Sequence, residues 1–354
     1  MKCVSLASFR KPPMKAGIVG CGAQAREHLM ALKRVNDLQL VAVCDTEQKR
    51  AAETAREWRI PHYYTQFAEM MEKEDLSVVT VITPPQTHAS LIKEAINHHV
   101  NLLVEKPLTM STDEAESVRR ALQNTPVRLT VNYTALLSRV MLQALSLIRQ
   151  GEIGNVLGSE VFMLDTPDDP MTADQNHWSH QLSGGRFTEM LSHPIYLVQS
   201  VLGNNLKVNQ VIAEKRGNLQ WMKYDELHIM LQSISGVAHV YCSFNAPRQE
   251  MLVEVFGSKG ILHVDLENQT LVKAGRRTLS KIGSAKDTLR VSSTLTLQTA
   301  RNAFTYLLRR RGESAIQTAY KSLINSISTN TELIVTPEMA CATVRIVENC
   351  SKMI

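Results

Sequence analysis

The segment Ala16–Ala25 constrains this chain more than any other, because an apolar run there ends in the pattern Gly-x-Gly-x-x-Ala. A helical pattern over residues 26–36 follows at once. A strand, a glycine turn and a helix in this order suit a dinucleotide pyrophosphate, since the glycines allow the tight turn and the close approach of phosphate. The positive end of the helix then faces the anion. The turn residues Gly20, Gly22, Ala23 and Gln24 are therefore candidate cofactor contacts.

A second apolar run, residues 38–44, ends at Asp45, which lies 25 positions after Gly20. An acidic residue near this spacing accepts hydrogen bonds from the adenosine ribose, and it disfavours the additional phosphate of NADP. The pattern therefore predicts NAD as the cofactor, with NADP less favoured, although Lys49 and Arg50 could weaken that preference. The alternative is a solvated aspartate at the start of the next helix, where Asp is common.

The composition fits a cytoplasmic protein with two domains. A chain of 354 residues, 44% apolar and 21% charged, can bury two cores. The net charge of +5 is small and the basic residues are scattered, so we expect no nucleic-acid partner. The sequence has no run of 18 apolar residues, and the apolar stretch within residues 1–13 is too short for a signal peptide, so we expect no membrane partner. Dispersed cysteines without metal-ligand spacing predict reduced thiols and no metal site: Cys3, Cys21, Cys44, Cys242, Cys341 and Cys350.

Strand and helix patterns alternate through the first third of the chain. Strand patterns that are apolar throughout, such as residues 77–82, indicate burial on both faces, as in a parallel sheet covered by helices. We therefore predict an α/β protein with an N-terminal, doubly wound Rossmann sheet over residues 14–135, after a loosely ordered extension over residues 1–13. The predicted strands are 16–20, 38–44, 77–82, 100–104 and 127–131, and the predicted helices are 26–36, 48–58, 66–73, 87–97 and 112–123.

The pattern changes after residue 135, which predicts an α+β domain over residues 136–354. Its strands alternate in polarity, so we expect an open, mainly antiparallel sheet in which 237–244 and 251–256 are neighbours. We expect a mobile loop within the polar segment 267–293, and a site in the cleft between the two domains. The predicted strands are 155–164, 206–214, 227–234, 237–244, 250–256 and 260–266, and the predicted helices are 136–150, 186–202, 297–310, 314–328 and 337–351.

A Glu-Lys-Pro sequence, residues 105–107, lies at the carboxyl end of a predicted parallel strand. Open α/β sheets bind their ligands at this edge. The ammonium of Lys106 could polarise a carbonyl oxygen during reduction, or share the proton during oxidation of an alcohol. The alternative is a surface lysine paired with the neighbouring Glu105.

Glu189 and His193 lie four residues apart, on one face of a predicted helix that follows a double glycine. A carboxylate beside an imidazole could steady the ring and raise its pKa, which suits general acid–base catalysis near neutral pH. The alternative is a surface pair without a chemical role. A zinc site is disfavoured because no third ligand is suggested, even though His177 and His180 lie nearby.

Taken together, these motifs resemble the Gfo/Idh/MocA oxidoreductases over nearly the whole chain from about residue 15. The resemblance implies a Rossmann domain followed by an α+β domain whose open sheet often builds dimers or tetramers. It also implies NAD(P)-dependent hydride transfer between nicotinamide and a hydroxyl or carbonyl carbon of a sugar, cyclitol or related polyol. The matching segments are 20–25, Asp45, 83–88, 105–107, 151–154, 184–193 and 257–260.

Position by position, the resemblance makes Lys106 and His193 catalytic residues that also contact substrate. Glu189 has the third such role, but it stands where the family pattern usually has aspartate, so its carboxylate reaches one methylene further. Further substrate contacts are Asn132, near the expected nicotinamide pocket, and Trp178, which either walls the substrate site or packs in the core. The loop residue His88 either lies over the cofactor or only shapes its loop. Further candidate cofactor contacts are Thr83, Pro84, His88 and Glu105.

The function predicted from the sequence is that of an NAD(P)-dependent dehydrogenase or reductase that acts on CH–OH groups. His193, aided by Lys106, would take the hydroxyl proton while a hydride passes to the nicotinamide. We expect a small-molecule substrate and a homodimer or homotetramer formed through the C-terminal sheet. The alternatives are an NAD-retaining glycoside hydrolase or eliminase, and a non-catalytic regulator that binds dinucleotide. The pairing of Lys106 with His193 argues against the regulator.

Overall fold

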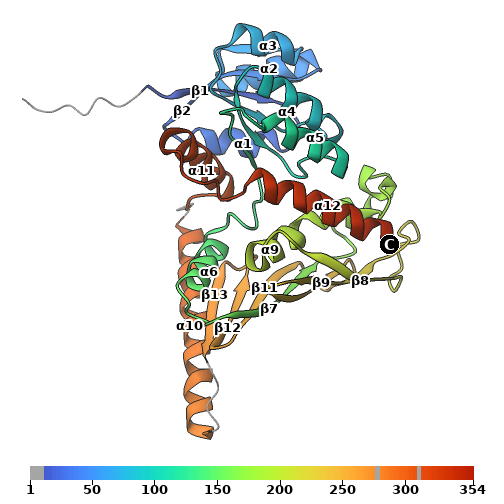
Figure 1. Ribbon diagram of the computed structural model, residues 1–354, viewed down its shortest axis with the longest axis vertical. Helices are drawn as coiled ribbons and strands as arrows, with labels where there is room; N and C mark the ends of the chain where they lie inside the picture. Colours follow the sequence, from blue (N-terminus) through green and yellow to red (C-terminus); the bar gives the residue numbers. More distant parts are fainter. Residues whose placement is uncertain (1–11, 276–279, 309–311) are drawn as a thin grey trace, which may run out of the picture.

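The N-terminal part of the chain forms a parallel sheet of six strands in the order β3-β2-β1-β4-β5-β6 (Figure 1). The computed structural model describes residues 12–275, 280–308 and 312–354. All strand pairs in this sheet are parallel, which confirms the predicted doubly wound fold. The strands are β1 (Met14–Val19), β2 (Leu38–Cys44), β3 (His62–Tyr64), β4 (Val78–Val81), β5 (Asn101–Val104) and β6 (Leu129–Val131).

The direction in which the sheet grows reverses between β1 and β4, its two central strands. Ligands of open α/β sheets bind at such a switch point, beyond the carboxyl ends of the strands. Gly20 follows β1, Asp45 follows β2, Glu105 follows β5 and Asn132 follows β6, so the fold places these candidates along one edge. The connecting helices are α1 (Ala25–Leu32), α2 (Gln48–Trp58), α3 (Phe67–Lys73), α4 (His88–Asn97) and α5 (Thr112–Leu122), with the short helix η1 (Pro85–Thr87).

A second sheet has seven strands in the order β13-β12-β11-β7-β10-β9-β8. It is mainly antiparallel, as predicted, but β7 pairs with β10 in parallel. The prediction that residues 237–244 and 251–256 are neighbours is wrong, because β7 lies between β10 and β11. Alternation of polarity fixes the face that a side chain occupies, but not the strand beside it. The strands are β7 (Val156–Leu164), β8 (Lys207–Glu214), β9 (Glu226–Ser233), β10 (Gly236–Ser243), β11 (Glu250–Gly257), β12 (Gly260–Asp265) and β13 (Thr270–Gly275).

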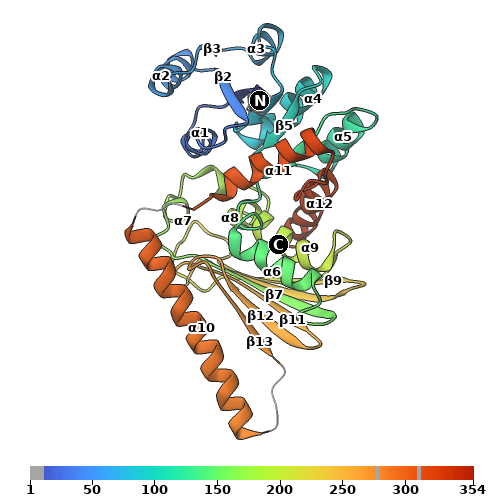
Figure 2. The same ribbon diagram turned by 90° about the vertical axis from the view of Figure 1, so that its left-hand side faces the viewer.

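Most of the remaining helices that contact a sheet pack on one of the two, and α12 contacts strands of both. α9 packs on β7 and β10, and α6 packs on β12 and β13. α11 contacts α1, β5 and β6, and α12 contacts α5, α9 and β8, so the C-terminal helices lie between the two sheets (Figures 1 and 2). These helices are α6 (Arg139–Arg149), α7 (Pro170–Ala173), η2 (Trp178–Gln181), α8 (Arg186–Met190), α9 (Ser192–Leu202), α10 (Lys281–Leu307), α11 (Ala315–Thr329) and α12 (Pro337–Met353).

The structure defines two predicted segments further. Within the polar segment 267–293, where we expected a loop, β13 pairs with β12 and α10 begins at Lys281, while residues 276–279 lie outside the described residues. The predicted helix 186–202 is divided at Leu191 into α8 and α9. Pro194 accounts for the division, since proline has no N–H to donate to the carbonyl of Met190 one turn earlier. Of the predicted extension, residues 1–11 lie outside the described residues.

Two further observations concern the cysteines and the helices. Five cysteines are described, and each is a buried free thiol. Cys3 lies outside the described residues. No helix within residues 12–275, 280–308 and 312–354 combines the length and apolar character that a membrane crossing requires.

Candidate active site

The turn after β1 requires glycine at its first position. Gly20 has a φ of +98°, and a Cβ built on it would lie 2.6 Å from the carbonyl oxygen of Ile82. A Cβ on Gly22 would meet nothing within 4 Å among the described residues, so space is open beside the turn. Ala23 and Gln24 lead into α1, whose N-terminus has no side-chain cap. The turn therefore leaves a helix end free for an anion.

Asp45 is fixed next to this turn. Its carboxylate accepts hydrogen bonds from the N–H of Cys21 and the N–H of Glu47, both at 2.9 Å, and its side chain is buried. The alternative of a solvated aspartate is therefore wrong. A carboxylate can accept about four hydrogen bonds, so a ribose can occupy the two positions where Arg50 now makes only long contacts of 3.4 Å. Nη1 of Arg50 lies 3.4 Å from the same carboxylate, and the Arg50 side chain is half exposed. An arginine placed in this way could tolerate the additional phosphate of NADP.

The loop after β4 is tied to the Glu-Lys-Pro segment by His88. The ring of His88 is fully buried, with Nε2 3.0 Å from the carbonyl oxygen of Thr83 and Nδ1 2.9 Å from that of Pro107. Burial lowers the pKa of His88. Because both ring nitrogens face backbone carbonyls, this geometry favours the loop-shaping alternative. Thr83 accepts a hydrogen bond from Thr87 at 2.7 Å and, with Pro84, lies at the more exposed part of the loop.

Glu105 is the centre of a buried polar network. One carboxylate oxygen lies 2.7 Å from Nε2 of His28 and accepts a 2.7 Å hydrogen bond from the amide of Asn132. The other accepts the backbone N–H of Lys106 at 3.1 Å. Burial raises the pKa of Glu105, but its hydrogen bonds, with His28 first, hold that pKa below the usual value. Glu105 thus orients the backbone at Lys106.

The network continues to the C-terminal helix α11 through residues that the sequence reading missed. Nδ1 of His28 lies 3.1 Å from the hydroxyl of Tyr320, which lies 2.9 Å from the hydroxyl of Thr80. The only sequence signal was a histidine on the apolar face of α1. Asn132, which belongs to the same network, has a buried amide oxygen that finds no hydrogen-bond partner among the described residues.

Lys106 meets Glu189 across the two halves of the molecule. Nζ of Lys106 binds one oxygen of Glu189, and Arg186 binds the other. The alternative that Lys106 pairs with Glu105 is therefore wrong. Burial raises the pKa of Glu189, but the charges of Lys106 and Arg186 outweigh it and hold that pKa at about 2. Glu189 is consequently an anion at any physiological pH.

Arg186 is a site residue that the sequence reading missed. Its side chain is only 2% exposed, 3.8 Å from a carboxylate oxygen of Asp169 and with its guanidinium 5.5 Å from the ring centroid of Phe244. A charged residue directly after a double glycine looks like part of an exposed turn, so its burial had no signal in the sequence. In the structure it fixes the position of Glu189, and through Glu189 that of Lys106.

His193 lies on α9 within reach of the Lys106 charge. Its Nδ1 lies 2.7 Å from the hydroxyl of Tyr196, whose ring stacks on Tyr133 at 4.1 Å. Burial and the charge of Lys106 lower the pKa of His193 to about 3. Glu189 does act to raise this pKa, but burial and the charge of Lys106 outweigh its effect, so the prediction of a raised pKa is wrong. His193 is therefore neutral at pH 7.

The segment before α8 holds the remaining candidates. Trp178 is 42% exposed, so the alternative of a core tryptophan is wrong. His177 contacts Ser179 at 2.8 Å, and burial lowers the pKa of His180. In the part of the chain that the structure describes, no three His, Cys, Asp or Glu side chains gather as metal ligands.

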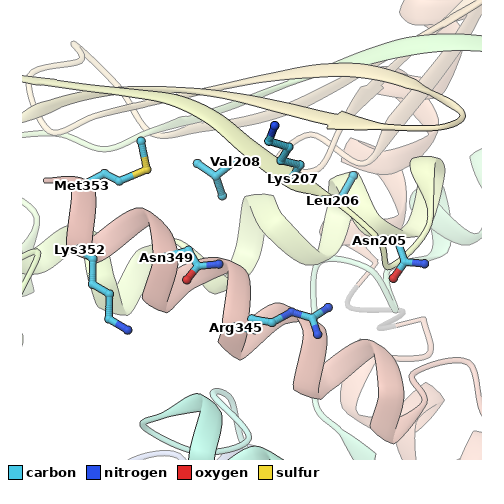
Figure 3. Close-up of a pocket in the computed structure, with 8 residues that line it drawn as sticks. All are labelled: Asn205, Leu206, Lys207, Val208, Arg345, Asn349, Lys352 and Met353. Carbon is cyan, nitrogen blue, oxygen red and sulfur yellow. The ribbon is translucent and has the colours of Figure 1, made fainter.

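Two cavities lie near the C-terminus. One, of about 620 Å³, lies between the start of β8 and the end of α12, and contains none of the predicted site residues (Figure 3). We therefore do not place the active site there. A smaller one, of about 110 Å³, is bounded by Gly184, Gly185, Arg186 and His180 among others, and so adjoins the Glu189 cluster.

Comparison with known families agrees with this arrangement along most of the chain. Residues 14–133 match the oxidoreductase family with an NAD-binding Rossmann fold, GFO/IDH/MocA, and residues 141–263 match the GFO/IDH/MocA C-terminal domain. The chain belongs to the Gfo/Idh/MocA family. The predicted family, oxidoreductase class and NAD cofactor are thereby confirmed.

Individual relatives of this Gfo/Idh/MocA protein are distant. The scyllo-inositol 2-dehydrogenase (NAD(+)) of Bacillus subtilis is 26% identical over 262 residues, 71% of this chain and 73% of the relative. A glycosyl hydrolase family 109 protein of Shewanella is 25% identical over 170 residues, 44% of this chain and 36% of the relative. The WlbA dehydrogenase of Bordetella pertussis, solved with NADH and UDP-GlcNAcA, has a TM-score of 0.77 at 16% identity, covering 98% of this chain and 96% of that one.

The residues present fit a nicotinamide dinucleotide. Gly20 and the uncapped start of α1 leave room and N–H donors for phosphates, and Asp45 retains acceptor capacity for a ribose. The unpartnered amide oxygen of Asn132, buried at the carboxyl end of β6, suits a donor such as a carboxamide. The Gfo/Idh/MocA cofactor therefore has candidate contacts for its phosphates, one ribose and its carboxamide along one edge of the first sheet.

Proposed function

We propose that this protein interconverts a secondary alcohol and a ketone on a sugar, cyclitol or related polyol. The observation that carries the proposal is the meeting of Lys106, from the end of β5, with Glu189 beside the neutral His193. A cation for the substrate oxygen and a neutral imidazole for its proton are the two groups that such a reaction needs.

NAD, when bound, supplies the acceptor or donor of the hydride, and NADP is the less favoured cofactor. In the oxidation, Nε2 of His193 takes the hydroxyl proton, because Nδ1 is engaged with Tyr196. For this, Nδ1 carries the hydrogen and donates it to the hydroxyl oxygen of Tyr196, which also accepts the N–H of Ala135 at 3.2 Å. Lys106 stabilises the negative charge that develops on the substrate oxygen, and Glu189 holds Lys106 in place. Reduction uses the same groups in reverse.

The test is a screen of polyols, sugars and nucleotide sugars for reduced nicotinamide formed by the purified protein. We expect His193→Ala to lower kcat roughly 100- to 10,000-fold, the usual contribution of a general acid–base group, with little change in NADH affinity. Lys106→Met should fall in the same range. A His193→Ala protein that turned over a true substrate like the unaltered enzyme would refute the assignment.

A second candidate function is supported by the similarity to glycosyl hydrolase family 109. In this alternative the protein retains NAD, oxidises a glycoside transiently and reduces it again after elimination of the glycosidic bond. Such an enzyme releases sugar without net formation of reduced nicotinamide, whereas a dehydrogenase forms one equivalent per turnover. Measuring both products in one reaction distinguishes the two.

We propose further that copies of the chain associate through the face of the second sheet that carries Tyr241, Phe162 and Leu252. These side chains lie opposite one another on β10, β7 and β11 and are only partly buried. An apolar row on an open sheet suits a homodimer or homotetramer. We propose two domains, residues 14–135 and residues 136–354. The helices α11 and α12 belong to the second domain but pack back on the first sheet. The free thiols support a reducing, cytoplasmic location.

A further inference from the structure

In helix α10 polar side chains meet the sheet and large apolar side chains are exposed to solvent. This is the reverse of what a helix that only covers its own domain shows. It runs along the edge strand β13 and extends beyond the sheet (Figure 2). The side chains that meet the sheet edge are polar: Gln298 binds both the N–H and the carbonyl of Leu271, at 2.8 and 2.7 Å. Asn302 donates to the carbonyls of Asn268 and Gln269, both at 2.9 Å. Polar contacts thus hold α10, and its apolar residues point elsewhere.

The apolar residues of α10 form an exposed stripe. Ile282, Leu289, Leu297, Phe304 and Leu307 are each between 62 and 77% exposed to solvent. A folded protein rarely leaves a continuous row of large apolar side chains uncovered unless a partner binds there.

The stripe has the spacing of a coiled-coil seam. Its positions are three or four residues apart along the helix, and the positions between the large apolar residues are exposed too. We call this set the α10 seam: Ile282, Lys286, Leu289, Ser293, Leu297, Ala300, Phe304 and Leu307. From Ile282 to Phe304, small or polar residues therefore alternate with large ones, which provides both the knobs and the holes of a coiled coil.

We propose that the α10 seam binds the α10 seam of a second copy of this chain, in antiparallel orientation. When Ser293 of one copy faces Leu297 of the other, Leu289 faces Ala300 and Lys286 faces Phe304. Leu289 and Leu297 then each meet a small side chain, and the ammonium of Lys286 lies against the ring of Phe304, a favourable contact. Ile282 meets Leu307, which adds an apolar pair at each end of the seam. A two-fold axis at the centre generates every pair twice, as in an isologous interface.

The parallel orientation and a lipid surface fit the seam less well. A parallel pair would place Lys286 against Lys286 and Ser293 against Ser293, which combines like charges and opposes small with small. A lipid surface favours an unbroken apolar face with its cations at the sides, whereas Lys286 and Ser293 lie within the seam itself.

The size of the seam sets the strength to expect. A helix of 27 residues is about 40 Å long and about 10 Å wide, so one side offers roughly 400 Å² and a pair buries roughly 800 Å². This is below a standard interface of about 1,600 Å². We therefore expect an association that depends on protein concentration, or one that joins dimers formed through the second sheet.

The first test is the mass in solution, measured by sedimentation over a wide concentration range. Leu289→Glu combined with Leu297→Glu should halve the mass of the largest species. Leu295→Glu is the matched control, because Leu295 is 44% exposed on the same helix but lies outside the seam. Unchanged thermal unfolding verifies that the variants are folded. The proposal is overturned if the double variant keeps the unaltered mass, if Leu295→Glu dissociates equally, or if the unaltered protein is monomeric throughout.

The second test concerns orientation. Differently tagged Ser293→Cys and Leu297→Cys chains, mixed and mildly oxidised, should form the mixed disulfide in preference to either same-site disulfide. The unaltered chain is the background control, since its five described thiols are buried. Preference for same-site disulfides would refute the antiparallel pair. Binding of a monomeric protein to anionic vesicles, lost in the double glutamate variant, would show that the seam meets lipid instead.

Discussion

The strongest physical prediction concerns the stability of the protein in mild acid. The ordinary pKa of histidine, 6.5, falls to about 3 for His193 in the folded protein, because of burial and the nearby Lys106 charge. Between these two values the unfolded chain binds a proton that the folded chain does not, so acid favours unfolding. This contribution is absent above pH 6.5 and grows as the pH falls toward 3.

The magnitude follows from the two pKa values. A pH of 5 lies 1.5 units below the ordinary histidine pKa of 6.5. His193 is therefore protonated in the unfolded chain at this pH, whereas it is still neutral in the folded protein. Each unit corresponds to about 1.4 kcal/mol, so the protein should lose about 2 kcal/mol of unfolding free energy between pH 7 and pH 5 through His193 alone. His193→Asn should remove that part of the pH dependence.

Urea unfolding of both proteins at pH 7 and pH 5 measures this difference. His98→Asn is the matched control, because His98 is exposed and should leave the pH dependence as it is. NMR of histidine-labelled protein gives a direct check, since the resonance lost in His193→Asn should not titrate between pH 7 and pH 4.5. Equal pH dependence in the His193→Asn and unaltered proteins would refute the reasoning, as would a His193 resonance that titrates near pH 6.5.

Three further predictions concern the cofactor end and the buried network. Gly20→Ala should weaken NADH binding at least about tenfold and lower stability by about 1–3 kcal/mol, because the new Cβ meets the carbonyl of Ile82. Fluorescence titration would measure the weaker NADH binding, and urea unfolding would measure the lower stability. Unaltered NADH binding would contradict the prediction. Asp45→Ala should cost about 1–3 kcal/mol of NADH affinity but less of NADPH affinity, so the ratio of the two Kd values must shift. Tyr320→Phe should cost about 1–3 kcal/mol of stability, since His28 loses a buried partner. An unchanged unfolding free energy would exclude that role.

The first sheet was predictable because burial on both faces leaves a clear sequence pattern. The strand 38–44 was predicted with the bounds that β2 has, and β4 lies within the predicted 77–82. β3 was missed since it has three residues, none of them buried. β13 and the first half of α10 were missed for a different reason. In the first half of α10 the guanidinium of Arg290 donates to the backbone carbonyl of Lys273 on β13, so a polar residue there marks a contact and not a loop.

The candidate site was predictable in its members but not in its pairings. Strand ends and a double glycine singled out Lys106, Glu189 and His193, which the structure brings together. The alternative in which Lys106 pairs with Glu105 rests on sequence proximity and is wrong, because the fold turns Glu105 toward His28. The direction of the His193 pKa shift was also wrong. A spacing of four residues indicates a neighbour, but it shows neither how deeply the imidazole is buried nor that Lys106 lies close to it.

After burial, the charge of Lys106 is the main cause of the low pKa of His193, and the same charge serves the proposed chemistry. The ammonium of Lys106 opposes a proton on His193, and by the same field it favours negative charge on a substrate oxygen beside it. When a proton moves from that oxygen to His193, Lys106 stabilises the oxygen anion that is left and destabilises the imidazolium that forms. The first effect therefore offsets part of the second. Once the oxygen is an anion, it also offsets the effect of Lys106 on the imidazole and raises the pKa of His193. The histidine is consequently a weak base in the free protein and a stronger one only while it shares the site with a reacting hydroxyl.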